Sequence, residues 1–231
     1  MHKLLKFIGN IFSFILKGEI ALAIHDIALR TPNWLFHFNK AIILKNQILS
    51  MKIPEQLNPS VNVRIATVKD IDRVAIISNW EKTRVQNLMD RGSKCFLSSI
   101  NHNPPGALTW LAFGNCYIKG MGFKYNFPQK TAYGVFSLTL PEYRRKGLYL
   151  HMNKAIVDYA IKHDVETYYV LVEFTNHYSL NLRNKLGFQP IINVTYIKIL
   201  LLKICIVKNL EDNKLKVRLI VREPKGDITI I

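Results

Sequence analysis

Cysteine is scarce in this 231-residue sequence, and acidic residues are half as numerous as basic ones. The three cysteines, Cys95, Cys116 and Cys205, are an odd count without CxxC spacing, and each lies in an apolar stretch typical of a buried core. These features argue against a disulfide framework, a zinc site and a catalytic thiol. A reducing cytoplasm is therefore the expected compartment.

Long hydrophobic runs are also missing from the N-terminal region. Its longest uncharged run, residues 7–16, is far shorter than the roughly 20 residues that a transmembrane helix needs, and no small-residue cleavage site follows it. Lysines are spaced among Ile, Leu and Phe in residues 1–30, which fits an amphipathic helix. Two interpretations stay open: this helix makes a peripheral contact with a membrane, or it packs on the rest of the protein.

The shortage of acidic residues gives a formal net charge of +16, which attracts anionic partners such as nucleic acid, lipid head groups or a phosphorylated ligand. Nucleic acid is the least favoured of these, because the aromatic residues do not interleave with basic ones in a stacking pattern. A basic surface that serves solubility alone is the simplest alternative. With 49% hydrophobic and 21% charged residues, the chain is expected to fold.

Two prolines in "MKIPEQLNPS", residues 51–60, divide the chain. Before them, residues 1–52 are expected to form an N-terminal extension, with an amphipathic helix, a turn over "TPNWLFHFNK" and a strand over "AIILKNQIL". After them, residues 61–231 are expected to form the main domain. It opens with a strand, two helices and antiparallel strands, and Thr67 with Asp70 predicts a capping box at the start of the first helix.

Residues 131–188 alternate between strand and helix patterns: strand, turn, helix, strand, turn, helix. Such a crossover forces its two strands to run parallel. The tail that follows is rich in strands. We therefore predict an α/β fold of the α+β type: a mixed central sheet with antiparallel N-terminal strands, a parallel β-α-β crossover, flanking helices and an extra N-terminal helix.

The segment "LPEYRRKGLYLHMNKAI", residues 140–156, reads as the end of a strand, a basic turn and a helix. A helix that begins at a glycine turn presents free backbone N–H groups, which bind anions, and Arg144, Arg145 and Lys146 add positive charge. Gly147 has no side chain to keep a phosphate from the backbone. Neither GxxxxGK[ST] nor GxGxxG occurs, so a phosphate carrier of another kind is the expected ligand.

This loop and a later segment resemble the GCN5-related N-acetyltransferase (GNAT) family. The family signature is Arg or Gln, two residues, Gly, one residue, then Gly or Ala, and it corresponds here to residues 144–149. The later segment, "NHYSLNLRNKLGF", matches the family through Asn176, Ser179, Leu182 and the sequence LGF at 186–188. The two elements occur in the family's order with a strand between them, and the resemblance covers about residues 61–200.

The resemblance implies that acetyl-CoA is the acyl donor, that an amine is the acceptor and that no metal takes part. Transfer would proceed by direct attack of the amine within a ternary complex. The implied cofactor-binding residues are Leu138, Thr139 and Leu140 for the pantetheine arm, Arg144, Arg145, Lys146, Gly147, Leu148 and Tyr149 for the pyrophosphate, and Asn176 and Ser179 from the later segment.

The sequence departs from the family at two of these positions. Tyr149 stands where the signature has Gly or Ala, and Arg183 stands where many members have the tyrosine that protonates the leaving thiolate. Arginine cannot donate that proton, but it can stabilise the thiolate electrostatically. Tyr178 is a candidate for the missing acid, and Glu173, at the end of a strand, is the candidate general base, with a merely solvated carboxylate as the alternative.

Functions other than acetyl transfer stay open at this point. A protein that binds acyl-CoA or docks on a membrane without catalysis would keep the loop and could lack the tyrosine. A long-chain acyltransferase would need only a deeper pocket for the acyl group. The acceptor groove is expected in variable loops, "EKTRVQNLMDRG" and "IKGMGFKYNFPQK", which do not reveal the acceptor.

Overall fold

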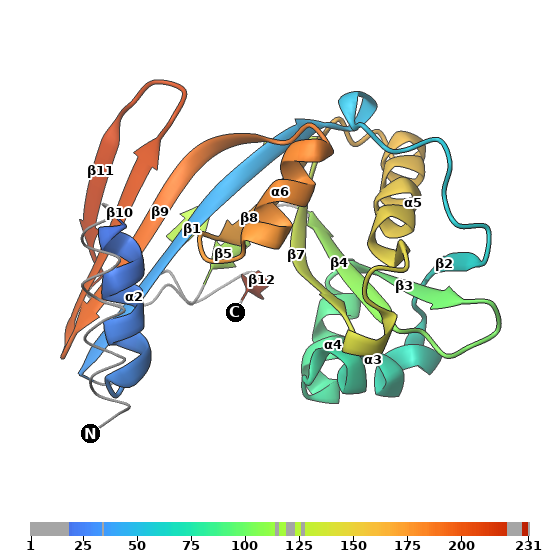
Figure 1. Ribbon diagram of the computed structural model, residues 1–231, viewed down its shortest axis with the longest axis horizontal. Coiled ribbons are helices and arrows are strands. Elements are labelled where there is room, and N and C mark those ends of the chain that lie inside the picture. The colour runs from blue at the N-terminus through green and yellow to red at the C-terminus, as the bar shows by residue number, and fades with distance from the viewer. Residues whose placement is uncertain are drawn as a thin grey trace.

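The computed structural model describes residues 19–33, 35–113, 116–118, 123–125, 128–220 and 228–230 (Figure 1). Its α-helices are α2 (Ile20–Arg30), α3 (Ile71–Ser78), α4 (Lys82–Asp90), α5 (Leu148–Lys162) and α6 (His177–Lys185). Its strands are β1 (Phe36–Gln47), β2 (Val61–Ile65), β3 (Lys94–Ile100), β4 (Ala107–Phe113), β5 (Cys116–Ile118), β6 (Phe123–Tyr125), β7 (Thr131–Thr139), β8 (Thr167–Glu173), β9 (Gln189–Ile199), β10 (Leu202–Asn209), β11 (Leu215–Leu219) and β12 (Ile228–Ile230).

Nine of these strands form one mixed sheet in the order β11-β10-β9-β1-β8-β7-β4-β3-β2. The pair β7 and β8 is parallel and is joined by α5, while the other neighbours in the sheet are antiparallel. The predicted fold class, with its antiparallel N-terminal strands and parallel crossover, is confirmed. Strands β5, β6 and β12 form a separate small sheet, which the sequence pattern did not indicate.

Strand β1 lies in the middle of the large sheet, between β8 and β9 and antiparallel to both. It begins at Phe36, which pairs with Ile199 of β9, so the turn expected over residues 31–40 ends sooner than predicted. The alternation of apolar and polar residues in "FHFNK" is too short to predict a strand by itself. Pairing with β9 makes these residues part of β1. The division of the chain at residues 51–60 stays a prediction. Strand β1, which precedes this division, pairs within the sheet formed by the strands that follow it.

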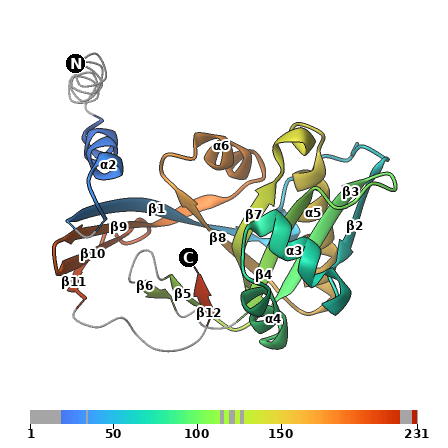
Figure 2. The same cartoon turned by 90° about the horizontal axis from the view of Figure 1, so that it is seen from below.

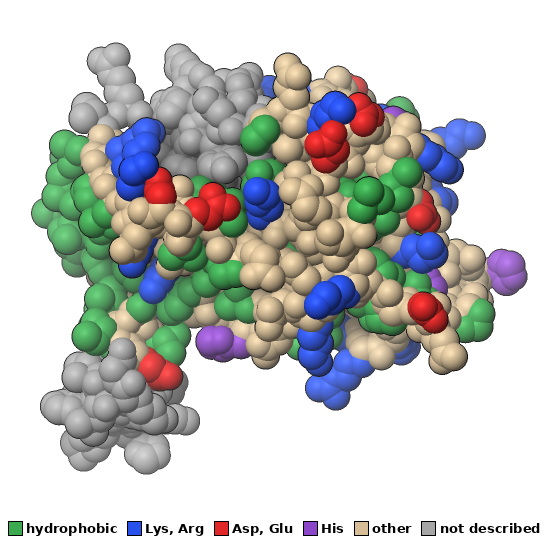
Figure 3. All heavy atoms as spheres, turned by 90° about the horizontal axis from the view of Figure 1, so that it is seen from above, with side chains coloured by type: hydrophobic (Ala, Val, Ile, Leu, Met, Phe, Trp, Pro, Cys, Tyr) green, Lys and Arg blue, Asp and Glu red, His purple; other side chains and the backbone are tan. Residues whose placement is uncertain are grey.

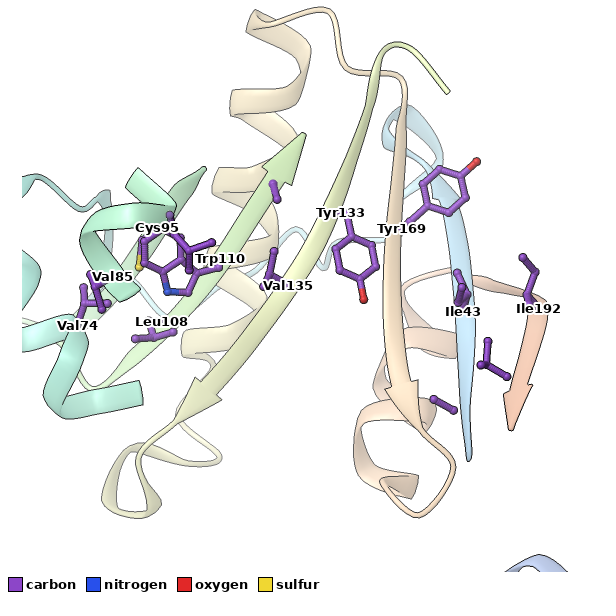
Figure 4. Packing of buried hydrophobic residues seen from close by; sticks show 14 of the residues in the cluster. Ile43, Val74, Val85, Cys95, Leu108, Trp110, Tyr133, Val135, Tyr169 and Ile192 are labelled. Carbon is purple, nitrogen blue, oxygen red and sulfur yellow. The ribbon is translucent and has the colours of Figure 1, made fainter. Parts of the chain in front are cut away.

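Helices cover both faces of the sheet around β3, β4 and β7, whereas β11 is exposed along its length (Figures 1 and 2). On one face α3 and α4 pack over a buried cluster that includes Val74, Val85 and Trp110 (Figure 4). On the other face α5 places Met152 and Ile156 in a second buried cluster. A hydrophobic core therefore lies on each face of the sheet, between the strands and the helices that pack on them.

Two cysteines lie in the first core. Cys95 and Cys205 are free and buried, and burial raises the pKa of both thiols, to about 11 for Cys205. A raised pKa disfavours the thiolate, so these two residues are suited to packing. The side chain of Cys116 lies outside the described residues.

Helix α2 packs against β1 and the end of β8. Ala23 and Ala28 are buried, and the ring of His25 lies edge-on to Phe174 at 5.6 Å. Ile20 and Leu29 stay exposed. Within the described residues, no helix is both long enough and apolar enough to cross a bilayer. The expected helix over residues 1–30 is thus seen from Ile20, and its earlier part lies outside the described residues.

The predicted capping box is present at the start of the first helical segment. Asp70 accepts hydrogen bonds from the backbone N–H of Thr67 at 2.8 Å and from both terminal nitrogens of Arg64 at 2.7 and 2.6 Å. The bonds from Arg64, and then the one from Thr67, lower the pKa of Asp70 to about 2. A carboxylate with a lowered pKa stabilises the fold at neutral pH and loses that contribution in acid.

We expect Asp70→Asn to be less stable than the wild type at neutral pH. The difference should shrink as the pH falls from about 4, the pKa of an unfolded aspartate, to about 2, because the wild type then protonates Asp70 as well. Urea unfolding at several pH values measures this. Asp158→Asn, which removes an exposed i,i+4 pair with Lys154, is the control and should change little. A difference that stays constant down to pH 2 would contradict the assignment.

Candidate active site

The parallel strands β7 and β8 separate before either of them ends. They pair only from Thr131 and Thr167 to Gly134 and Val170, although β7 continues to Thr139 and β8 to Glu173. The register between β7 and β4 shifts at this level, where Trp110 pairs with Phe136 and the next residue, Leu111, with Gly134. One extra residue in β7 forms a β-bulge, which bends the strand away from β8 (Figure 4). An open strand edge results.

Gly134 lies at the vertex of this opening, and the fold leaves no room there for a side chain. A Cβ on Gly134 would lie 2.7 Å from the Tyr168 hydroxyl and 3.0 Å from Val170 Cγ1. Both contacts are made by side chains of β8, which fill the space beside the glycine directly before the strands part. The glycine inside the predicted strand was the only sequence signal for this vertex.

We expect Gly134→Ala to destabilise the protein by about 1 to 3 kcal/mol, since the added methyl group must displace Tyr168 or Val170. Urea unfolding measures the loss. Tyr168→Phe removes the nearer atom, so it should restore part of the stability when combined with Gly134→Ala. Additive effects of the two changes would show that the hydroxyl does not cause the strain.

Beyond the open edge, a short turn positions the basic loop. The ring of Tyr143 lies against Gly106, where a Cβ would overlap it, and the N–H of Leu140 donates to the carbonyl of Gly106 at 2.9 Å. In a trans peptide the carbonyl of Thr139 points the opposite way, toward the open side. It accepts a hydrogen bond from Arg144 Nε at 3.3 Å. Arg144 therefore lies at the mouth of the opening.

Two residues of the loop that precedes α5 have a left-handed backbone conformation. Arg145 has φ 62° and Gly147, the N-cap of α5, has φ 84°. The first N–H that bonds back into the helix belongs to Leu150, so those of Gly147, Leu148 and Tyr149 precede the helical ladder. Nothing lies within 4 Å of where a Cβ on Gly147 would be. Open space, free donors and the exposed side chains of Arg144, Arg145 and Lys146 are features that suit an anion, so the anion site here stays a prediction.

Arg183 of α6 is buried, with 4% of its surface exposed. Its guanidinium carbon lies 4.9 to 5.5 Å from the ring centres of Tyr149, Tyr168 and Phe188, and its Nη1 donates to Asn153 Oδ1 at 3.2 Å. Its buried Nε has no hydrogen-bond partner among the described residues. Burial raises the pKa of Tyr168 to about 12, against the opposing effect of Arg183. A cation thus lies behind the vertex, where the surroundings exclude water.

The other predicted residues lie at the ends of β8 and α6. Glu173 is exposed, and by strand alternation it shares the face of Tyr169 and Leu171, which is the side of α3 and α4. Asn176 caps α6, because its Oδ1 accepts the N–H of Ser179 at 3.0 Å. Tyr178 is 74% exposed and so lies outside the buried cluster around Arg183.

Several residues that shape the site were not singled out in the sequence. They are Gly134 at the vertex, Val135 at the bulge, Tyr143 beside the basic loop, and Asn153 and Tyr168 next to Arg183. The described residues contain no group of His, Cys, Asp and Glu side chains suited to hold a metal ion. The arrangement can bind an extended anionic ligand from the mouth of the opening to its vertex.

The sequence model of the acetyltransferase (GNAT) family matches residues 72–188, which lie within the range expected from the resemblance. No curated protein matches the sequence significantly. Three solved structures have a similar fold. A functionally unknown protein from Staphylococcus epidermidis has a TM-score of 0.53 and 9% identity, and the match covers 76% of this chain and 65% of that protein. For a Drosophila protein the TM-score is 0.50, the identity 16% and the coverage 81% of this chain and 57% of that protein, and for a tandem GNAT protein from the clavulanic acid biosynthesis pathway the TM-score is 0.52, the identity 12% and the coverage 71% and 54%. This chain spans less than two thirds of each, and such low identities bear on the fold alone.

Proposed function

This chain belongs to the GNAT acetyltransferase family, and from that premise we propose that it transfers the acetyl group of acetyl-CoA to an amine of a second substrate. One observation carries the proposal: β7 and β8 separate at Gly134, and the opening leads along the free edge of β7 to the glycine-initiated end of α5. An acyl-CoA has the matching order of parts, with a thioester, an extended amide-containing arm and a pyrophosphate.

The residues at the start of α5 fit the pyrophosphate of this donor. The N–H groups of Gly147, Leu148 and Tyr149 would bind its oxygens, with Arg144, Arg145 and Lys146 compensating its charge. The bulk of Tyr149, the departure from the family signature, is directed toward Arg183, whose guanidinium carbon lies 5.0 Å from its ring centre. The phosphate therefore keeps access to the backbone.

The free edge of β7 would hold the pantetheine arm. Residues Leu138, Thr139 and Leu140 form its end, with the carbonyl of Thr139 turned toward the opening and already bonded to Arg144. Backbone groups on such an edge pair with the amides of an extended ligand as a neighbouring strand would. Asn176 and Ser179, at the start of α6, would contact the donor from the side of β8.

Glu173 would act as the general base. It would take a proton from the acceptor ammonium, after which the amine nitrogen attacks the acetyl carbonyl carbon. N–H groups at the bulge of β7 would stabilise the oxyanion. When the tetrahedral adduct collapses, the C–S bond breaks and the CoA thiolate leaves with the electron pair, while the remaining excess proton on the nitrogen passes to solvent water. The exposed position of Glu173 on the α3 and α4 side gives an acceptor access to it.

Arg183 would stabilise the thiolate at a distance. Its guanidinium lies behind the vertex, beside Tyr168, whose hydroxyl is near Gly134. A charge acts more strongly through a buried, water-poor region than through solvent. Tyr178 is the alternative as a proton donor, and its exposure would let it reach the leaving group only from the solvent side.

A second candidate function is the binding of an acyl-CoA without turnover. The replacement of the family's acidic tyrosine by Arg183 favours it, because the anion site requires no proton donor. A longer acyl donor would be held by the same loop and edge.

A thiol-release assay separates these functions. Purified protein is mixed with acetyl-CoA and a panel of amines that includes polyamines, aminosugars and peptides with free N-termini, and free CoA is followed by its thiol. We expect amine-dependent release that Glu173→Gln abolishes. Calorimetric binding of acetyl-CoA or a long-chain acyl-CoA without release from any amine would favour the binding protein. No binding of either donor would exclude both.

A further inference from the structure

The turn between β9 and β10 is built from residues that turns in water rarely use. Leu200 and Leu201 form a two-residue connection, and Leu200 has φ 53°, a left-handed conformation that Asn and Gly adopt far more readily. Leu201 is 95% exposed. The chain therefore accepts both backbone strain and exposed apolar surface at this tip, a combination that points to a function for it.

The apolar surface continues around the tip. Leu35, whose carbonyl accepts the N–H of Leu200 at 2.7 Å, is exposed, as are Ile199 and Leu202 on either side of the turn. By register, the same face of the sheet carries Val217 and Leu219 of β11, which are also exposed. Figure 3 shows hydrophobic side chains gathered along the margin that β10 and β11 form.

A row of basic residues lies directly behind the tip. His37 pairs with Lys198, and Lys198 pairs with Lys203, across three neighbouring strands. Like charges directly opposite each other on neighbouring strands repel. Strands β9, β10 and β11 contain four lysines, one arginine and no acidic residue. Burial and the charge of Lys198 lower the pKa of His37, which disfavours a third positive charge in this row.

We propose that this tip, comprising Leu35 and residues 199–202, inserts into an anionic lipid bilayer while Lys198 and Lys203 contact the head groups. Apolar side chains at a protruding turn, with cations one residue behind them, match the depth profile of a membrane interface. A second copy of the chain would bring its own lysines against these. The segment of residues 1–18 would do the same, because it contains lysines and no acidic residue. Charge therefore favours lipid over both.

Vesicle flotation with the full chain tests the proposal. Vesicles of phosphatidylcholine alone are compared with vesicles that contain one part phosphatidylglycerol to three parts phosphatidylcholine. Leu200→Asn with Leu201→Ser gives the turn residues that suit it better, so the fold should be kept while the apolar tip is lost. Leu49→Ser, at a residue that is 85% exposed elsewhere, is the matched control.

We expect the wild type and Leu49→Ser to float with the anionic vesicles and the tip variant to bind at least about tenfold more weakly. Lys198→Gln with Lys203→Gln should weaken binding by about tenfold or more, whereas Lys69→Gln with Lys162→Gln should not, although the change in net charge is the same. Equal binding of the tip variant and its control would overturn the proposal, as would no flotation of the wild type. A dimer of the wild type that the tip variant loses, without lipid binding, would instead assign the tip to self-association.

Discussion

Gly147→Glu is expected to weaken acetyl-CoA binding by at least about a hundredfold, which corresponds to roughly 3 kcal/mol. The new carboxylate would occupy the open space at the start of α5, where a Cβ meets nothing within 4 Å. It would take the place of the pyrophosphate beside Arg145 and Lys146 and repel it. Isothermal calorimetry with acetyl-CoA measures the effect.

Gly92→Glu is a closely matched control for this prediction. Gly92 has φ 82° against 84° for Gly147, and nothing lies within 4 Å of its Cβ position either. Both variants therefore pay a similar cost, about 1 to 2 kcal/mol, for a side chain in the left-handed region. Equal loss of binding in both variants would show that the cause is strain, and normal binding by Gly147→Glu would place the donor elsewhere.

Arg183→Gln is expected to lower kcat by about a hundredfold and to leave the KM for acetyl-CoA nearly unchanged. Under the proposed mechanism this charge acts only when the thiolate forms, and the loss of one electrostatic stabiliser of a transition state typically lowers kcat by a factor of this size. Glutamine can still donate to Asn153, so that buried oxygen need not lose its partner. Steady-state kinetics and a thermal unfolding scan are measured together.

Arg183→Lys separates charge from shape in the same experiment. Lysine keeps the positive charge but cannot lie flat among the rings of Tyr149, Tyr168 and Phe188. We expect its kcat to exceed that of Arg183→Gln by about tenfold, at similar unfolding temperatures. If kcat follows the unfolding temperature in both variants, Arg183 supports the fold and not the chemistry.

The local parts of the site could be predicted from the sequence. The turn into α5 depends on residues that are neighbours in the chain, as do the capping box of Thr67 and Asp70 and the cap of α6 by Asn176. Helical and strand periodicity was sufficient for these elements, and the family resemblance added their order.

The long-range parts could not be predicted in this way. The bulge of β7 depends on its register with β4, and no pattern within β7 fixes that register. The surroundings of Arg183 combine α5, β8 and the residue before β9, so its seven-residue spacing from Asn176 indicated the helix but not the burial. Strand β1 showed a strand pattern but no sign of which strands it would join.

The central place of β1 sets the order in which the protein can be completed during synthesis. Thr167 of β8 and Gln47 at the end of β1, which share a hydrogen bond, are 120 residues apart in the chain. The other edge of β1 needs β9, which emerges later still. Until both arrive, β1 has neither neighbour, and such distant pairing makes folding slow. A chain truncated after residue 188 would contain the whole segment that matches the acetyltransferase family, but one edge of β1 would lack its partner strand. We expect such a product to aggregate.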